Sequence, residues 1–152
     1  MCCFQLSRVE QLLLLTGRFI LIMNNPGFQS LQGLRVLVVE DNLINQRLFM
    51  RILMQWQVTT DLAANGRIAL DLLTKNVYDV VLMDIMMPEL DGYDVTRAIR
   101  AMDGDYFHNL PIYAFSSCPD PERILECEMN GQITKSPPDR EELYQTISSY
   151  RK

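Results

Sequence analysis

The chain has 152 residues, of which 48% are hydrophobic and 22% are charged, and its formal net charge is −5. This length suits one domain with a sizeable core, and the composition is that of an ordinary globular protein. Proteins that bind nucleic acid neutralise phosphates with clustered Lys and Arg. Because the chain is acidic and contains no basic run, we expect no nucleic-acid partner.

The first 33 residues differ from the rest of the chain. Their apolar residues, at 12–15 and 19–23, are separated by a polar interruption. A membrane-spanning helix needs about 20 consecutive apolar residues, so this stretch predicts no membrane insertion. The residues that follow it are polar and turn-rich. We interpret residues 1–33 as an extension and linker that is disordered or not native, with Met23 as an alternative start, and residues 34–152 as the folded domain.

The four cysteines have neither the density of a disulfide framework nor the spacing of a zinc site. They are Cys2, Cys3, Cys118 and Cys127. Free thiols are usual in a reducing compartment. The cysteines therefore favour a cytoplasmic location.

From Leu34 onward, apolar runs typical of strands alternate with segments of helical periodicity. The expected strands are residues 34–39, 58–63, 79–83, 110–115 and 132–134. The expected helices are residues 45–56, 67–74, 91–102 and 121–128, with a last helix that starts at the proline pair 137–138. Strict alternation implies parallel strands joined by right-handed crossovers. The sequence thus predicts an α/β fold, a single doubly wound five-stranded parallel sheet with helices on both faces.

Polar residues stand where four of these strands end. Glu40 and Asp41 follow the first strand and Asp84 ends the third, while Ser116 and Lys135 follow the fourth and fifth. In a parallel sheet these ends share one edge, where such folds bind their ligands. Carboxylates this close raise one another's pKa unless a cation is present, and oxygen ligands beside an anion suit Mg²⁺. Because an Asp carboxylate can act as a nucleophile, Asp84 is the candidate acceptor of a phosphoryl group.

This arrangement resembles the CheY-like receiver domain of two-component response regulators. The residues that carry the resemblance are Val36-Leu37-Val38-Val39-Glu40-Asp41-Asn42 with Asn45, then Asp84-Ile85-Met86-Met87-Pro88-Glu89-Leu90-Asp91-Gly92, then Ser116, and finally Lys135. The resemblance covers residues 34 to about 150 and implies the flavodoxin-like strand order 2-1-3-4-5.

The resemblance also implies a role for each matching residue. Asp84 would take a phosphoryl group from a phosphohistidine. Mg²⁺ would be bound by Asp41, by Asp84 and by the backbone carbonyl of Met86, with Glu40 acting directly or through water. Ser116 would be the switch hydroxyl that moves to the phosphoryl oxygen. Lys135 would pair with the phosphoryl group and stabilise charge during transfer.

The chain departs from the family pattern near its fifth strand. The family commonly has Pro after the active-site Lys, whereas Ser136 follows Lys135 here. The family's switch aromatic usually lies three residues before that Lys, at the position of Gln132, so Tyr113 and Phe115 become the candidates for its role. The interval from Ser116 to Lys135 is also shorter than usual, which places a deletion in the helix between them.

Three functions remain open from the sequence. The first is a signalling receiver, stand-alone or detached from a hybrid kinase, and not an enzyme beyond self-phosphorylation and self-dephosphorylation. Its partners would be a sensor histidine kinase or histidine phosphotransfer protein and a downstream protein target, and it would be a monomer or a weak phosphorylation-dependent dimer. The second is a degenerate receiver that binds proteins without being phosphorylated. The third is an Asp-nucleophile phosphatase, which would need a second acid where the chain has Met86.

Overall fold

The computed structural model describes residues 28–117, 119–135 and 138–151. The interpretations of residues 1–27 and of Cys118 and Ser136 therefore lie outside the described residues. Within them, no helix is long and apolar enough to cross a membrane.

Five parallel strands form the centre of the molecule. They are β1 (Arg35–Val39), β2 (Thr59–Ala63), β3 (Val80–Asp84), β4 (Ile112–Ser116) and β5 (Gly131–Thr134). Their order in the sheet is β2-β1-β3-β4-β5, and every neighbouring pair is parallel. This arrangement confirms the α/β fold that the sequence pattern predicted and the strand order that the family resemblance implied. The central strand β3 is buried along its whole length, as its unbroken apolar run requires.

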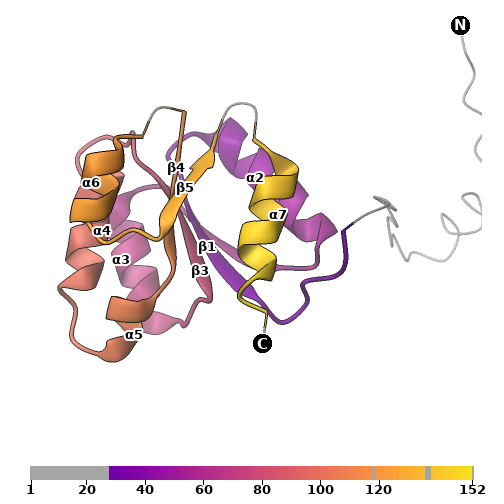
Figure 1. Cartoon of the computed structure of the whole chain (residues 1–152), viewed down its shortest axis with the longest axis horizontal. Coiled ribbons are helices and arrows are strands. Elements are labelled where there is room, and N and C mark those ends of the chain that lie inside the picture. The colour runs from indigo at the N-terminus through magenta and orange to yellow at the C-terminus, as the bar shows by residue number, and fades with distance from the viewer. Residues whose placement is uncertain (1–27, 118, 136–137, 152) are drawn as a thin grey trace, which may run out of the picture.

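Helices cover both faces of the sheet (Figure 1). The helices are α2 (Leu43–Gln55), α3 (Gly66–Lys75), α4 (Gly92–Arg100), α5 (Asp105–Asn109), α6 (Pro121–Glu126) and α7 (Arg140–Ser148). In Figure 1, α2 and α7 lie on one face, whereas α3, α4, α5 and α6 lie on the other. Asn or Asp side chains cap the N-termini of five of the helices, all except α5, because these side chains accept the backbone N–H groups that a first turn leaves unpaired.

Helix α5 is the one element that the sequence did not predict. It contains His108 and lies between the helix expected over residues 91–102 and the strand expected over residues 110–115. The helix follows Gly104, which has no side chain that could cap it, so the usual starting signal is missing. Tyr106 and Phe107 pack against the core, and the Tyr106 hydroxyl accepts the backbone N–H of Tyr78 at 2.8 Å. Tertiary contacts therefore stabilise a short helix that its local sequence does not predict.

The alternation of side chains along β1 divides the core into two layers. Leu37 and Val39 join the layer beneath α3 and α4, whereas Val36 and Val38 join the layer beneath α2 and α7. The second layer also takes in residues just before β1, since Leu31 is fully buried there and donates its N–H to the carbonyl of Trp56 at 2.7 Å. The last residues of the stretch interpreted as a linker thus pack onto the domain.

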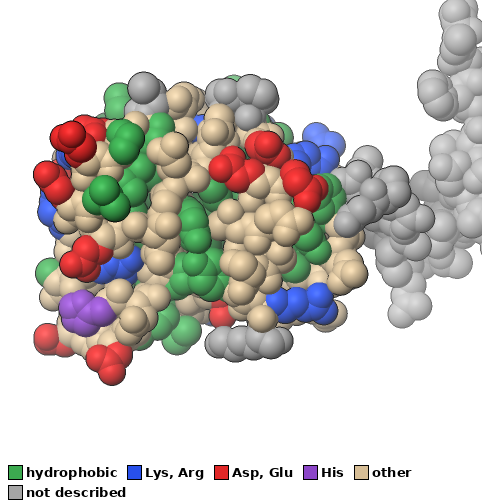
Figure 2. Space-filling view, in the orientation of Figure 1, with side chains coloured by type: hydrophobic (Ala, Val, Ile, Leu, Met, Phe, Trp, Pro, Cys, Tyr) green, Lys and Arg blue, Asp and Glu red, His purple; other side chains and the backbone are tan. Residues whose placement is uncertain are grey.

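The surface of the domain carries acidic side chains in groups. Figure 2 shows them over α6 and near the N-terminal end of α7. Glu141 and Glu142 stand in the first turn of α7, where the helix dipole favours negative charge. These acidic residues therefore support the helix start that follows Lys135.

Gly92 sets how closely α4 approaches the end of β3. A Cβ atom at this position would lie 2.3 Å from the backbone oxygen of Asp84 and 2.9 Å from Cγ of Met83. The Gly92 N–H also bonds to the carbonyl of Ile85 at 3.0 Å. Only a residue without a side chain fits between α4 and the end of β3.

We expect Gly92→Ala to lower the free energy of unfolding by about 1–3 kcal/mol, because the added methyl group meets backbone that cannot move freely. Chemical denaturation checks this. Gly104→Ala is the control, since Gly104 has a positive φ but open space around it and reports backbone strain alone. An unchanged free energy of unfolding in Gly92→Ala would show that the close approach at Gly92 is unimportant.

Candidate functional site

Three carboxylates meet at the edge where β1 and β3 end. Glu40 and Asp41 follow β1 and Asp84 is the last residue of β3, and these strands are neighbours in the sheet. One ligand atom from each residue lies within 4.8 Å of the others. Glu40 is 1% exposed and Asp84 2% exposed, whereas Asp41 is exposed. The structure therefore brings together the acid cluster that the strand ends predicted.

Lys135 joins the two buried carboxylates. It follows β5, and its Nζ lies 2.6 Å from Oδ2 of Asp84 and 2.8 Å from Oε2 of Glu40. The Lys135 side chain is itself only 14% exposed, so water screens these ion pairs weakly. One ammonium group thus stands between two carboxylates that have almost no contact with solvent.

The pKa values of Asp84 and Lys135 respond to this burial. Burial raises the pKa of Asp84 above its ordinary value and the charge of Glu40 adds to the rise, although the bonds from Lys135 and from the Met86 N–H oppose it. Burial alone would lower the pKa of Lys135, but its hydrogen bonds to Asp84 and Glu40 and the charges of both raise it overall. Lys135 therefore remains charged at neutral pH.

Side chains and backbone of α2 hold Glu40 in place. Its Oε1 accepts the backbone N–H of Asn42 and the side-chain amide of Asn45, both at 3.1 Å. Its backbone carbonyl accepts the side-chain amide of Gln46 at 2.6 Å. Asn45 belonged to the family motif, whereas Gln46 was missed. A polar residue on the buried face of an apolar helix was the available signal.

Met86 and Ser116 lie beside the cluster. The Met86 N–H donates to Oδ1 of Asp84 at 3.1 Å, while its side chain is exposed. Ser116 ends β4 and is buried, and its backbone carbonyl accepts the N–H of Lys135 at 3.4 Å. All the residues predicted to form the site therefore come from the same edge of the sheet.

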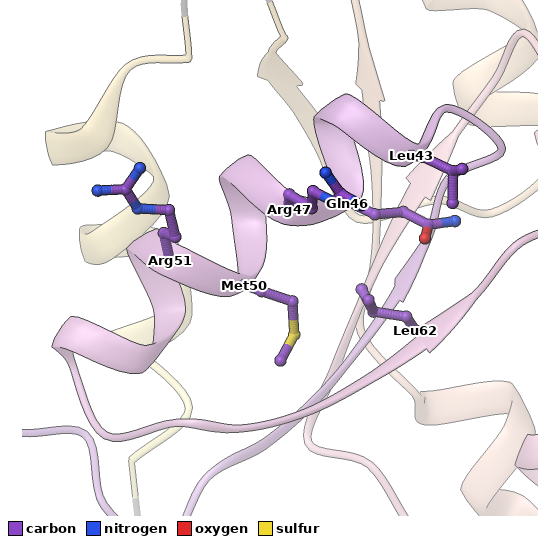
Figure 3. A pocket seen from close by; sticks show the side chains of 6 residues that line it. All are labelled: Leu43, Gln46, Arg47, Met50, Arg51 and Leu62. Carbon is purple, nitrogen blue, oxygen red and sulfur yellow. The ribbon is translucent and has the colours of Figure 1, made fainter.

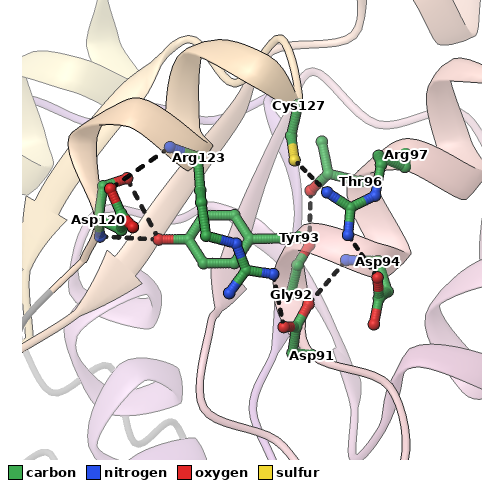
Figure 4. Close-up of polar contacts among 9 residues, drawn as sticks. All are labelled: Asp91, Gly92, Tyr93, Asp94, Thr96, Arg97, Asp120, Arg123 and Cys127. Atoms are coloured by element: carbon green, nitrogen blue, oxygen red, sulfur yellow. Dashed lines mark hydrogen bonds and ion pairs between the residues drawn. The ribbon is translucent and has the colours of Figure 1, made fainter.

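A second polar network joins the loop after Asp84 to α6 (Figure 4). The Tyr93 hydroxyl accepts the backbone N–H of Asp120 at 2.8 Å. The Arg123 guanidinium lies 4.0 Å from the centre of the Tyr93 ring and pairs with Asp91 at 3.0 Å. Because Asp91 caps α4 and Asp120 caps α6, these contacts hold the starts of the two helices together. None of them was predicted from the sequence.

The departures near β5 have visible consequences. Gln132 is exposed, so no aromatic ring occupies that place. Tyr113 is half-buried on β4 and its hydroxyl lies 2.9 Å from that of Tyr150, whereas Phe115 is buried and packs edge-to-face on Phe49. Burial raises the pKa of Tyr113 to about 12, with the Tyr150 hydroxyl adding to the rise. The helix between Ser116 and Lys135, where the sequence placed a deletion, is α6, and it has six residues.

A shallow groove of about 350 Å³ runs between α2 and β2. Figure 3 shows side chains from both elements around it. It is lined by Leu43, Gln46, Arg47, Met50, Arg51 and Leu62. Gln46 connects the groove to the acid cluster through its bond to Glu40. The first turn of α2 thus presents an apolar surface directly beside the cluster.

Carboxylate oxygens are the groups available to a metal ion at the cluster. Oxygen donors without thiol or imidazole suit hard cations such as Mg²⁺ or Ca²⁺ better than Zn²⁺. Two of the three acids are buried and compensated by a single ammonium, so an excess of negative charge remains. The donor set therefore fits a divalent cation.

Known proteins share both the sequence pattern and the fold. The family model of the response regulator receiver domain matches residues 36–148. The polar-differentiation response regulator DivK of Brucella anthropi is 35% identical over 118 residues, which cover 76% of this chain and 94% of DivK. Hybrid signal transduction histidine kinase B of Dictyostelium discoideum is 30% identical over 128 residues, or 76% of this chain. The chain spans 6% of the length of that kinase.

A solved structure gives the same result. The receiver domain of sensor histidine kinase PA1611 from Pseudomonas aeruginosa, which has a magnesium ion coordinated in its active site cleft, is 34% identical with a TM-score of 0.70. The match covers 78% of this chain and 97% of that one. The chain therefore belongs to the response regulator receiver domain family and has the CheY-like fold of two-component signalling proteins.

Proposed function

We propose that Asp84 accepts a phosphoryl group from a phosphohistidine on a partner protein, in a Mg²⁺-dependent step, and that the phosphorylated domain signals through altered protein binding. The observation that carries this proposal is the contact of the Lys135 ammonium with Asp84 at 2.6 Å, at an edge that also holds Glu40 and Asp41. This contact places the positive charge of Lys135 beside the carboxylate that would carry the phosphoryl group.

In the transfer, a carboxylate oxygen of Asp84 forms a bond to phosphorus while the N–P bond of the donor imidazole breaks. The electron pair of that bond returns to the ring nitrogen. Lys135 pairs with the phosphoryl oxygens and keeps the carboxylate in position. Ser116, at the end of β4, supplies the hydroxyl that bonds to the phosphoryl group once it is attached.

The metal would be held by Asp41 and Asp84, by the carbonyl of Met86, and by Glu40 directly or through water. When bound, Mg²⁺ supplies positive charge that offsets the charge of the transferring oxygens. The magnesium ion of the PA1611 receiver domain supports this part of the proposal. The exposure of Asp41 leaves one carboxylate of the cluster open to an incoming hydrated ion.

The degenerate-receiver alternative is favoured by Gln132, since an exposed amide cannot act as an aromatic switch. The phosphatase alternative needs an acid two residues after the nucleophile, and Met86 cannot donate a proton. We further propose that the receiver domain comprises residues 34–152, with the preceding Leu31 packed onto it, and that it functions in the cytoplasm as a monomer or a weak dimer that forms on phosphorylation.

The phosphodonor would be a sensor histidine kinase or a histidine phosphotransfer protein. Leu43 and Ile44 begin α2 and are largely exposed, Ile44 by 77%. Both follow Asp41 closely, so a protein that presents a phosphohistidine to Asp84 would cover them. Apolar side chains at the centre of a protein contact contribute strongly to binding.

Asp84→Asn tests the acceptor directly. With acetyl phosphate and Mg²⁺, we expect the wild-type protein to gain the mass of one phosphoryl group, stable in acid and labile in base. The variant should gain none, because an amide is not a nucleophile here. Intact-mass spectrometry with Mg²⁺ or EDTA measures both. Asp103→Asn, at an exposed turn, is the control and should behave as wild type; an unmodified wild-type protein would favour the degenerate receiver.

Lys135→Met should leave two buried carboxylates without their cation and lower the free energy of unfolding by about 3–5 kcal/mol in EDTA. Added Mg²⁺ should recover more stability in this variant than in wild type, because the ion replaces part of the missing positive charge. Urea denaturation with EDTA or Mg²⁺ gives both values.

The control for this measurement is Lys75→Met. Lys75 also lies 2.6 Å from a carboxylate, that of Asp71, but both side chains are exposed, so the loss should stay below about 1 kcal/mol. Equal losses in Lys135→Met and Lys75→Met would show that the buried ion pairs do not hold the site together.

Ile44→Ala should reduce phosphotransfer from a histidine phosphotransfer protein about tenfold in kcat/KM, and should leave phosphorylation by acetyl phosphate unchanged. The reason is that the small donor needs no protein contact on α2. Met54→Ala, which removes an exposed apolar side chain near the other end of the same helix, should change neither rate. A parallel fall with both donors would place the defect in the chemistry and not in docking.

A further inference from the structure

The two oxygens of the Glu40 carboxylate have different partners. Its Oε1 accepts two N–H groups, from the Asn42 backbone and the Asn45 side chain, both at 3.1 Å. A carboxylate oxygen has about two lone-pair sites, so these bonds fill Oε1. Its Oε2 is buried, and its one contact among the described residues is the ion pair with Lys135, 2.8 Å from Nζ. Oε2 is therefore the oxygen that Glu40 presents to the cluster.

Asn42 and Asn45 contribute to this restraint in different ways. The Asn42 N–H belongs to the backbone at the start of α2, and the Asn42 side chain caps the helix by accepting the N–H groups of Ile44 and Asn45. The Asn45 side chain takes no part in that cap, and its amide instead reaches the Glu40 carboxylate. Asn45 can thus be changed without removing the signal that starts the helix.

The number of oxygens that a carboxylate can offer bears on which ion it prefers. Ca²⁺ takes six to eight oxygen ligands and readily accepts both oxygens of one carboxylate, whereas Mg²⁺ demands a smaller, nearly octahedral set. A carboxylate contributes a single oxygen when hydrogen bonds fill both lone-pair sites of the other oxygen, and removing one of those bonds frees a site. This restraint disfavours Ca²⁺ more than Mg²⁺.

We propose that Asn45 is a specificity-determining residue of the acid cluster, because it restrains Glu40 to one available oxygen and thereby favours Mg²⁺ over Ca²⁺. The inference rests on the divalent-cation site of the proposed function, in the form in which Glu40 binds the ion directly. Asn45 acts through Glu40 and need not touch the ion, so it is a positioning residue. Groups that hydrogen-bond to metal-binding carboxylates commonly change metal affinity 10- to 100-fold when they are removed.

The test compares Mg²⁺ and Ca²⁺ binding by isothermal titration calorimetry in the unphosphorylated chain. Asn45→Leu keeps the size of the side chain but loses the amide. We expect it to bind Mg²⁺ about tenfold more weakly and Ca²⁺ with a smaller loss, so that the preference for Mg²⁺ falls. Asn45→Gln retains an amide donor and should restore much of the preference.

Gln145→Leu is the matched control. It removes another side-chain amide that bonds to a glutamate, Glu141, at 2.7 Å on the exposed face of α7, and should leave both affinities unchanged. Thermal unfolding of each variant establishes that it is folded.

Infrared difference spectra of wild-type protein with isotope-labelled glutamate give a second measurement. When Mg²⁺ is added to the wild-type protein, the separation of the two carboxylate stretching bands should indicate a single bound oxygen. When Ca²⁺ is added to Asn45→Leu, this separation should be smaller, which would indicate that both oxygens bind.

An unchanged Mg²⁺-to-Ca²⁺ ratio in folded Asn45→Leu would overturn the inference and leave the proposed function intact. A two-oxygen signature in wild type with Mg²⁺ would also overturn it, even if the Leu variant does not fold. If the wild-type protein bound neither ion, the metal site of the proposed function would be wrong, and the inference that rests on it would be overturned as well.

Discussion

The structure depends on one ammonium group that two buried carboxylates share. Glu40 and Asp84 are almost completely excluded from water, and Lys135 contacts both within 2.8 Å. Removing charges from water is costly, and only close partners offset that cost. The ion pairs tie the ends of β1 and β3 to the residue after β5. The same contacts that hold three strand ends together also assemble the groups that we propose receive a phosphoryl group, so Lys135 would contribute both to stability and to function.

Much of the fold could be predicted because its signals are local. Apolar runs give the five strands, and their alternation with helical segments allows only a parallel sheet. Helix α5 escaped prediction because it starts without a capping side chain and depends on contacts of Tyr106 with distant residues. The buried position of Leu31 was missed for a similar reason. The sequence of a short polar segment does not show that its Leu31 N–H will donate to the distant carbonyl of Trp56.

The acid cluster was predictable from the sequence and its supporting contacts were not. Polar residues that end apolar runs must share the edge of a parallel sheet, so Glu40, Asp84 and Lys135 could be placed together. The hydrogen bond from the Gln46 amide to the Glu40 carbonyl depends on how α2 is rotated about its own axis where it packs on the sheet. The Arg123 contact with Tyr93 likewise requires the packing of α6 against α4. Periodicity and motifs do not specify either packing.

The central claim is that Lys135 stabilises the domain through the buried carboxylates and not merely by packing. A double-mutant cycle measures this most directly, with unfolding free energies in EDTA for wild type, Lys135→Met, Glu40→Gln and the double variant. If the claim holds, the loss caused by Lys135→Met shrinks by about 1–3 kcal/mol once Glu40 is neutral. Losses that add to within about 0.5 kcal/mol would contradict it, because the ammonium and the Glu40 carboxylate would then contribute independently.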